Sequence, residues 1–153
     1  MPAIPEGFQT VTPSLIVKDA ARAIDIYRKA FGAKEASRME DPQSGKIVHA
    51  CIDIGTSKVF LCDEIPGMCA AASGSSFYLY VPDVDAMFEQ AKNAGLETKS
   101  PPADMFWGDR TGTLTDPFGV MWTVATHVRD VSPGEMEKGR KEFMATMKGR
   151  KAA

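Results

Sequence analysis

The chain repeats one short pattern, and this repeat limits the folds that the sequence can adopt. An apolar segment leads to Val17 and Asp19, and the same arrangement returns 64 positions later at Val81 and Asp83. Each copy reads as an apolar strand, an aspartate, an amphipathic helix, a glycine and further strands. Because internal repetition indicates repeated structural units, the pattern predicts two similar modules that form one site between them.

Length and charge narrow the classes of protein that fit. The 153 residues suffice for one domain or for two small modules packed face to face. The net charge of −2 gives no reason to expect a nucleic-acid partner or an anionic membrane surface. No apolar run reaches the roughly 20 residues of a membrane span, and the N-terminal residues lack a signal-peptide pattern. Three irregularly spaced cysteines suit free thiols in a reducing compartment, so we expect a cytoplasmic protein.

Periodicity and turn residues predict the order of the elements. In a first module over residues 8–63, Asp19 caps a helix that ends at Gly32, with strands at 9–17, 33–40, 46–54 and 58–63. Residues 64–74 read as a linker. In a second module over residues 75–128, Asp83 caps a helix that ends at Gly95, with a loop at 101–108 and strands at 75–81, 96–99, 110–115 and 119–126.

A last helix is predicted over residues 132–149. Ser132 and Glu135 have the spacing of a capping box, with Pro133 at the first helical position. Its apolar stripe is narrow, so we expect it to pack on its own domain or on a partner subunit. One domain, residues 1–153, thus contains both modules and this helix.

Alternation along the strands separates a face that packs on the helices from a second, more polar face. Tyr78 and Tyr80 share the second face of their strand, Met121 and Thr123 share that of another, and His49 has the same position in the first module. These faces carry too few charges for open solvent, so we expect them to line one concave surface. An ordinary solvent-exposed sheet face is the alternative.

Two groups of motifs carry a resemblance to a known family. The first comprises residues 23–33 (AIDIYRKAFGA), 48–50 (VHA) and 61–64 (LCDE), and the second comprises residues 106–110 (FWGDR), 116–119 (DPFG) and 122–127 (WTVATH). Over residues 8–135 the chain resembles the vicinal oxygen chelate superfamily of glyoxalase and bleomycin-resistance proteins, and within it the PhnB-like branch. The resemblance implies an α+β fold of two βαβββ modules, each an incomplete β-barrel around a cleft, within a homodimer.

The resemblance also implies where a metal would bind. Metal-dependent members place His or Glu on the first and last strand of each module, and the corresponding positions here are Thr12, Leu61, Ser76 and Thr123. Hydroxyl and aliphatic side chains are poor ligands for divalent ions, and a shift of one residue would bring in only Cys62. We therefore expect no metal and no cofactor.

His49 is the candidate catalytic residue. Imidazole titrates near neutral pH, and Asp53 or Asp63 could orient the ring as a general base. A plain polar wall residue is the alternative, and a metal-ligand role is a third. His127 ends the last strand, and we expect it at the surface or at a subunit contact.

The segment from Phe106 to Arg110 offers recognition chemistry. Trp107 could stack on a planar ligand, and Arg110 could hold a carboxylate or phosphate in a bidentate fork. Alternatively, Trp107 fills a core edge and Arg110 pairs with Asp109 or Asp116.

These observations favour a metal-independent protein that binds an aromatic or amphipathic small molecule in its cleft. The expected ligand-binding residues are Ser14, His49, Asp63, Tyr78, Tyr80, Trp107, Arg110, Met121 and Thr123. The alternative is an enzyme of the superfamily, a glyoxalase-like lyase or isomerase or a dioxygenase-like protein, that uses a non-standard metal site or acid–base chemistry at His49. An interaction protein with a vestigial cleft is a third interpretation.

Overall fold

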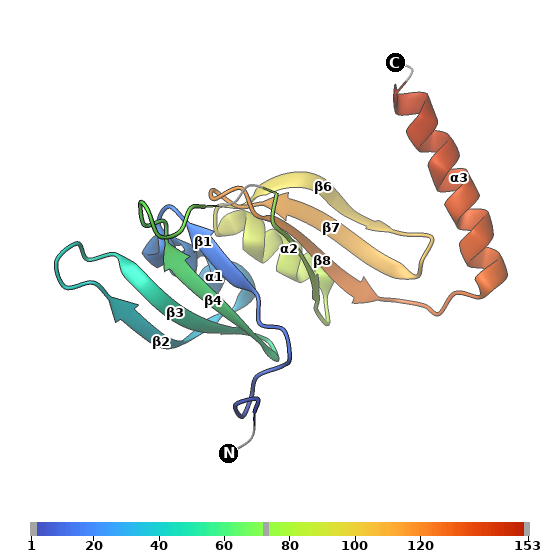
Figure 1. Cartoon of the computed structure of the whole chain (residues 1–153). Coiled ribbons are helices and arrows are strands. Elements are labelled where there is room, and N and C mark those ends of the chain that lie inside the picture. Colours follow the sequence, from blue (N-terminus) through green and yellow to red (C-terminus); the bar gives the residue numbers. More distant parts are fainter. Residues whose placement is uncertain (1–2, 72–73, 152–153) are drawn as a thin grey trace.

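A computed structural model describes residues 3–71 and 74–151 and contains two modules with the same order of elements (Figure 1). The first module comprises β1 (Ser14–Val17), α1 (Ala20–Phe31), β2 (Lys34–Glu40), β3 (Ile47–Ile54) and β4 (Ser57–Asp63). The second comprises β5 (Ser76–Tyr80), α2 (Val84–Asn93), β6 (Glu97–Asp104), β7 (Asp109–Thr115) and β8 (Met121–His127), and α3 (Pro133–Lys151) follows. The predicted α+β fold of two βαβββ modules is confirmed. Residues 72 and 73 of the predicted linker, and residues 1, 2, 152 and 153 of the predicted domain, lie outside the described residues.

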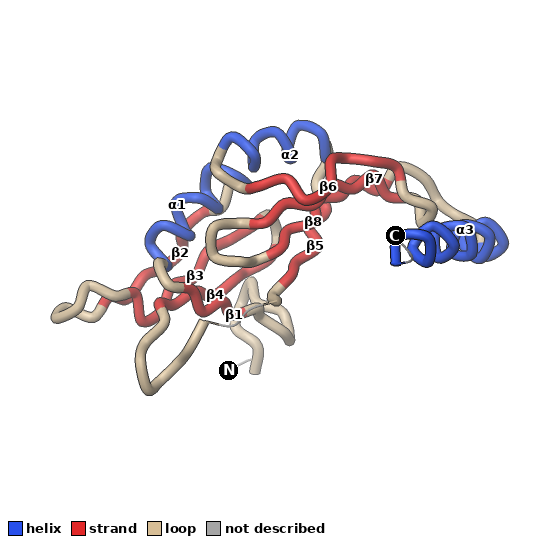
Figure 2. The backbone as a smooth tube through the Cα atoms, turned by 90° about the horizontal axis from the view of Figure 1, so that it is seen from above, coloured by secondary structure: helices blue, strands red, loops and turns tan. Residues whose placement is uncertain are grey.

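The two sheets have the same topology. Their strand orders are β1-β4-β3-β2 and β5-β8-β7-β6, with the first strand of each module parallel to the last and the other pairs antiparallel. Both sheets are open, and α1 and α2 lie together on one side of them (Figure 2). Within the described part of the chain, neither α1 nor α2 covers the opposite faces of the sheets, which we call the helix-free faces.

Both module helices begin at the predicted caps. The Asp19 carboxylate accepts a 3.0 Å hydrogen bond from the Arg22 amide, and the Asp83 carboxylate accepts one of the same length from the Ala86 amide. These bonds satisfy amide groups that have no partner within a first helical turn. Helix α1 ends at Gly32, whose φ of 68° is a left-handed conformation that glycine adopts without strain.

An aromatic cluster joins the modules. Trp122 of β8 is buried, and its ring lies 5.1 Å from Tyr27 and 4.5 Å from Phe31, both on α1. The Gln90 side chain of α2 adds a 3.0 Å hydrogen bond to the carbonyl of Ala30. Helix α1 of the first module therefore packs on a strand and on the helix of the second.

Two strand predictions were wrong in extent. The strand expected at 9–17 exists only over β1, and its pairing with β4 begins at Ser14. Pro13 just before it has no amide to donate to a ladder. The strand expected at 96–99 continues to Asp104 through Pro101 and Pro102. Strand β6 is an edge strand with register irregularities, which is where a sheet tolerates proline.

Helix α3 begins at the predicted capping box. Ser132 Oγ accepts a 3.3 Å hydrogen bond from the Glu135 amide, and Glu135 accepts one of 2.9 Å from the Ser132 amide. The helix extends away from the second module (Figure 1), and the Phe143 ring lies 5.7 Å from that of Phe106. Within the described part of the chain, none of the helices combines the length and apolar character that a membrane span requires.

Candidate functional site

The helix-free face of the second sheet carries the predicted aromatic residues. Tyr78 and Tyr80 of β5 are 45% and 63% exposed, and Met121 of β8 is 40% exposed. Trp122 and Val124, which alternate with them, are buried on the helix side. The prediction from strand alternation is confirmed for these residues. This face exposes large aromatic and apolar side chains, whereas an ordinary solvent-exposed sheet face carries mainly polar ones.

A buried carboxylate organises this face. Asp109, at the start of β7, is 3% exposed. Its Oδ2 accepts hydrogen bonds from the hydroxyls of Tyr78 (2.7 Å) and Tyr80 (2.9 Å), and its Oδ1 lies 2.8 Å from Nδ1 of His127. The two tyrosine rings lie 5.2 Å apart at 57°. We call Tyr78, Tyr80, Asp109 and His127 the Asp109 cluster.

The electrostatics of the Asp109 cluster follow from these contacts. Burial alone would raise the pKa of Asp109, but hydrogen bonds from His127, Tyr78 and Tyr80 outweigh it and leave that pKa below its usual value. Burial and the hydrogen bond to Asp109 raise the pKa of Tyr78 to about 12. The hydrogen bonds of His127 to Asp109 and to Asp130 raise the pKa of that imidazole. The cluster thus holds a carboxylate and an imidazole that protonates readily, beneath two neutral phenols.

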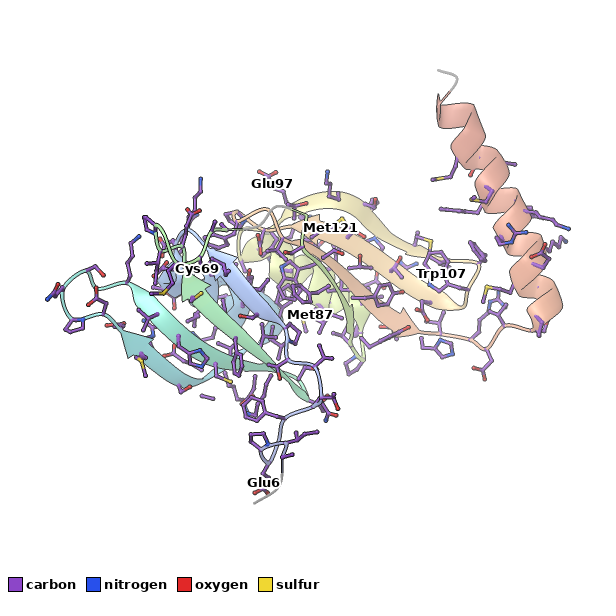
Figure 3. The ribbon with its side chains drawn as sticks, in the orientation of Figure 1. Glu6, Cys69, Met87, Glu97, Trp107 and Met121 are labelled. Carbon is purple, nitrogen blue, oxygen red and sulfur yellow. The ribbon has the colours of Figure 1, made fainter. Side chains whose placement is uncertain are left out.

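Trp107 extends this surface toward α3. Its Nε1 donates a 3.3 Å hydrogen bond to the hydroxyl of Tyr78, and its ring meets that of Phe106 edge to face at 5.1 Å. Figure 3 shows Trp107 and Met121 at opposite ends of the second sheet, so the predicted ligand residues of this module cover most of its length. The hydroxyl of Thr123 lies between them, 3.2 Å from that of Thr113.

A small apolar cavity lies beside Tyr78 where the modules meet. Its volume is about 220 Å³, and residues of both modules line it: Pro13, Ile54, Ser57, Val59, Phe77, Tyr78, Leu79 and Trp122. Tyr78 therefore belongs both to this cavity and to the Asp109 cluster, and it is the residue that the two features share.

His49 lies elsewhere, on the first sheet. Its side chain is exposed, and its ring meets that of Phe60 edge to face at 4.8 Å. The carboxylates expected to orient it have other partners: Asp53 accepts a 2.8 Å bond from Lys58 Nζ, and Asp63 accepts bonds from two backbone amides. Among the described residues His49 has no hydrogen bond to either carboxylate, and its catalytic role stays a prediction.

Asp63 has a structural position. It is 8% exposed, and its two oxygens accept hydrogen bonds from the amides of Ala20 (2.8 Å) and Ile47 (2.7 Å). These bonds fix the start of α1 and of β3 on the end of β4. Ser14, the other first-module residue expected to bind ligand, is exposed at the start of β1.

Arg110 points to the helix side of the second sheet. Its guanidinium forms 2.8 and 2.9 Å bonds with Asp85 of α2 and a 3.1 Å bond with Asp104, and these partners raise its pKa further. The alternative pairing with Asp109 or Asp116 is wrong, because the guanidinium bonds to Asp85 and Asp104. Strand alternation turns Arg110 away from its neighbour Asp109.

The strand register corrects one position of the metal comparison. Ser14 pairs with Phe60 as Tyr78 pairs with Thr123, so Phe60 is the counterpart of Thr123. Leu61, the residue predicted there, is buried in the core. Neither Phe60 nor the hydroxyls of Thr12, Ser76 and Thr123 suit a divalent ion, so these positions do not fit the superfamily's metal. Over residues 3–71 and 74–151, no three His, Cys, Asp or Glu side chains gather into a metal-binding group.

Asp109 and His127 were missed as cluster residues. His127 follows Thr123 and Ala125 at the two-residue period of β8 and faces Asp109 across the ladder. Strand alternation alone could have placed His127 on the aromatic face. Its contact with Asp109 depends on the register between β7 and β8.

Comparisons with known proteins agree with this architecture. A sequence model of the Glyoxalase/Bleomycin resistance protein/Dioxygenase superfamily matches residues 8–124. An uncharacterised protein of Mycobacterium bovis is 40% identical over 136 residues, which cover 83% of this chain and 89% of that protein. An uncharacterised protein of Arabidopsis thaliana is 30% identical over 115 residues, which cover 67% of this chain and 69% of the relative.

Solved structures share the fold. TioX from Micromonospora sp. ML1 superposes with a TM-score of 0.64 at 28% identity, covering 78% of this chain and 99% of TioX. A PhnB protein from Bacillus cereus has a TM-score of 0.62 at 18% identity, covering 77% of this chain and 99% of that protein. The second likeness is one of fold.

Proposed function

Because this chain belongs to the Glyoxalase/Bleomycin resistance protein/Dioxygenase superfamily, we propose that it binds an aromatic or amphipathic small molecule without a metal. The observation that carries this proposal is the pair of exposed tyrosines held by buried Asp109. The PhnB-like branch, a homodimer and a cytoplasmic location are parts of the same proposal. The oligomeric state is measurable by light scattering on the purified protein.

The tyrosines are prepared for stacking before a ligand arrives. Their hydroxyls are bound to one carboxylate, so the rings have lost rotamer freedom already on folding. A ligand that stacks on them does not have to order these side chains, which lowers the entropic cost of binding. The apolar cavity beside Tyr78 offers room for a nonpolar substituent of that ligand.

Metal independence is supported by the chemistry of the family positions. Thr12, Ser76 and Thr123 offer hydroxyls where metal-dependent relatives need imidazole or carboxylate. Stacking and shape need no such ligands. Elemental analysis, with thermal unfolding in Ni²⁺ and Zn²⁺, tests this part: a stoichiometric metal or a clear rise in melting temperature would overturn it.

The binding test uses two fluorescent probes of opposite charge, anilinonaphthalene sulfonate and acriflavine, with the full chain. We expect Y78A/Y80A to weaken binding of at least one probe about tenfold or more, which corresponds to about 1.4 kcal/mol. F143A is the matched control, because Phe143 on α3 is an exposed aromatic residue outside this site. Wild-type affinity of Y78A/Y80A for both probes, or loss of binding in F143A alone, would contradict the proposal.

A second candidate function, acid–base catalysis, is favoured by the pairing of His127 with Asp109. A carboxylate that contacts Nδ1 orients an imidazole and stabilises its protonated form. Both effects are useful in general acid–base catalysis. His49 has no carboxylate contact of this kind among its described contacts. Should a turnover be found, its loss in H127Q and retention in H49Q would assign it to the Asp109 cluster, and the reverse result would return it to His49.

A further inference from the structure

Two cysteines lie at the end of β4, apart from the Asp109 cluster: Cys62 is on the strand, and Cys69 is in the segment that follows it. Cys62 is half-buried near the end of β4, and its neighbours Leu61 and Asp63 are buried on the side of α1. Cys62 therefore points to the helix-free face of the first sheet. Cys69 is also half-buried, in the segment that follows β4 (Figure 3).

A short turn returns Cys69 to the end of β4. The Cys69 amide donates a 3.0 Å bond to the carbonyl of Ile65, and the Ile65 amide donates a 2.9 Å bond to the carbonyl of Cys69. The Cys69 thiol donates to the carbonyl of Asp63 at 3.5 Å, and Asp63 directly follows Cys62. Burial raises the pKa of the Cys62 thiol, and the nearby Cys69 side chain raises it further.

We propose that Cys62 and Cys69 are a redox-active dithiol that closes into an intramolecular disulfide. With a disulfide such as oxidised glutathione as the oxidant, one thiolate attacks a glutathione sulfur and releases one reduced glutathione. The second thiolate then attacks the mixed disulfide and releases another, so that two protein thiols are oxidised and one glutathione disulfide is reduced. Disulfide formation needs only two thiols, whereas a structural zinc site needs four ligands.

The disulfide would fix the segment after β4. This segment borders an open hollow of about 430 Å³, lined by Glu64, Pro66, Gly67, Met68, Cys69 and Ala70. Cys69 is part of that wall, so a bond to Cys62 would tie the wall to the sheet. Oxidation would thereby restrict the segment on the helix-free side of the first module.

The test is equilibration of the full chain in glutathione buffers of graded ratio, followed by alkylation and combined digestion with trypsin and the glutamate-specific protease. Cleavage after Lys58 and Glu64 separates the three cysteines into different peptides, 47–58, 59–64 and 65–89. We expect one cross-link, between peptides 59–64 and 65–89. Its equilibrium constant in native protein should exceed that in urea at least tenfold, about 30 mV in midpoint potential, because the fold brings the thiols together.

Variants separate this pair from the third thiol. C51S should form the same link, and C62S or C69S should form none. Should the buried Cys51 replacement impair folding, the identity of the linked peptides in wild-type protein decides by itself. Glutathione adducts without an internal link, a link through Cys51, thiols that stay free in every buffer, or an equal constant in urea would each overturn the proposal.

Discussion

The phenol of Tyr27 donates a 2.6 Å hydrogen bond to the carboxylate of Asp116, 89 positions further along the chain. Asp116 is 4% exposed and also accepts bonds from the indole of Trp122 and from the amides of Phe118 and Val120. One carboxylate thus closes the turn between β7 and β8 and binds α1 of the other module. This contact connects the two copies of the repeat.

Replacement of Tyr27 by phenylalanine should destabilise the protein by about 1.5–3 kcal/mol, the range for a hydrogen bond to a charged group. The ring stays in place, so the packing against Trp122 is retained. Urea unfolding measures the change. Y80F is the control, because its hydroxyl binds Asp109 from an exposed ring. Equal stability of Y27F and wild type would show that the bond between the modules contributes nothing net.

The same bond predicts a dependence on alkaline pH. Burial and the charge of Asp116 raise the pKa of Tyr27 far above its unfolded value of about 10. A group whose pKa is higher in the folded than in the unfolded state contributes its full stabilisation at pH values below the unfolded pKa. For Tyr27 this stabilisation is lost as the pH rises above about 10. The stability advantage of wild type over Y27F should therefore shrink by about 1 kcal/mol between pH 10 and pH 11. An advantage that is constant or grows across this interval would contradict the burial of a neutral phenol.

Removal of the Asp109 charge should lower the pKa of His127. Hydrogen bonds to Asp109 and Asp130 hold this pKa above its ordinary value. The chain has two histidines, so ring signals in proton NMR are few, and those of His49 serve as the internal reference. D109N should lower the His127 pKa more than D130N does, because Asp109 is buried and Asp130 is fully exposed.

Stability should follow the same titration of His127. A raised imidazole pKa contributes stability that is fully present below about pH 6.5 and is lost as the pH rises through the folded pKa. The stability difference between wild type and H127Q should decrease over that interval. A difference that increases with pH would reverse the assigned role of Asp109.

Gly112 of β7 should not tolerate a side chain. A Cβ atom there would lie 2.5 Å from Cδ2 of Phe88, a buried residue of α2, and 3.2 Å from Cγ of Pro102. G112A should therefore cost about 1–3 kcal/mol through overpacking. G134A, where a Cβ would meet nothing within 4 Å, is the control and should change the free energy of unfolding by less than about 1 kcal/mol. Equal urea midpoints for the two variants would disprove the close packing of α2 on β7.

Local features of the sequence predicted most of the fold. Asp19 and Asp83 mark helix starts because a carboxylate next to free amides is a local interaction. Alternation placed Tyr78, Tyr80 and Met121 on one face, since successive side chains of a strand point to opposite sides. The extent of β6 was predicted wrongly because Pro101 and Pro102 suggested a loop. An edge strand tolerates proline, and the position of a strand at the edge of a sheet depends on the other strands.

The candidate site was only partly predictable. The sequence determined two modules, their helix caps and the aromatic character of one sheet face, all of which depend on neighbours within a few positions. Tertiary structure alone decided that Asp109 binds His127 and two tyrosines, that Arg110 turns to Asp85, and that Tyr27 reaches Asp116. These partners are distant in the chain. Strand register and the packing of α1 between the modules bring them together. The free energy that favours this packing comes from burial of the whole hydrophobic core, which cannot be read from any short segment of the sequence.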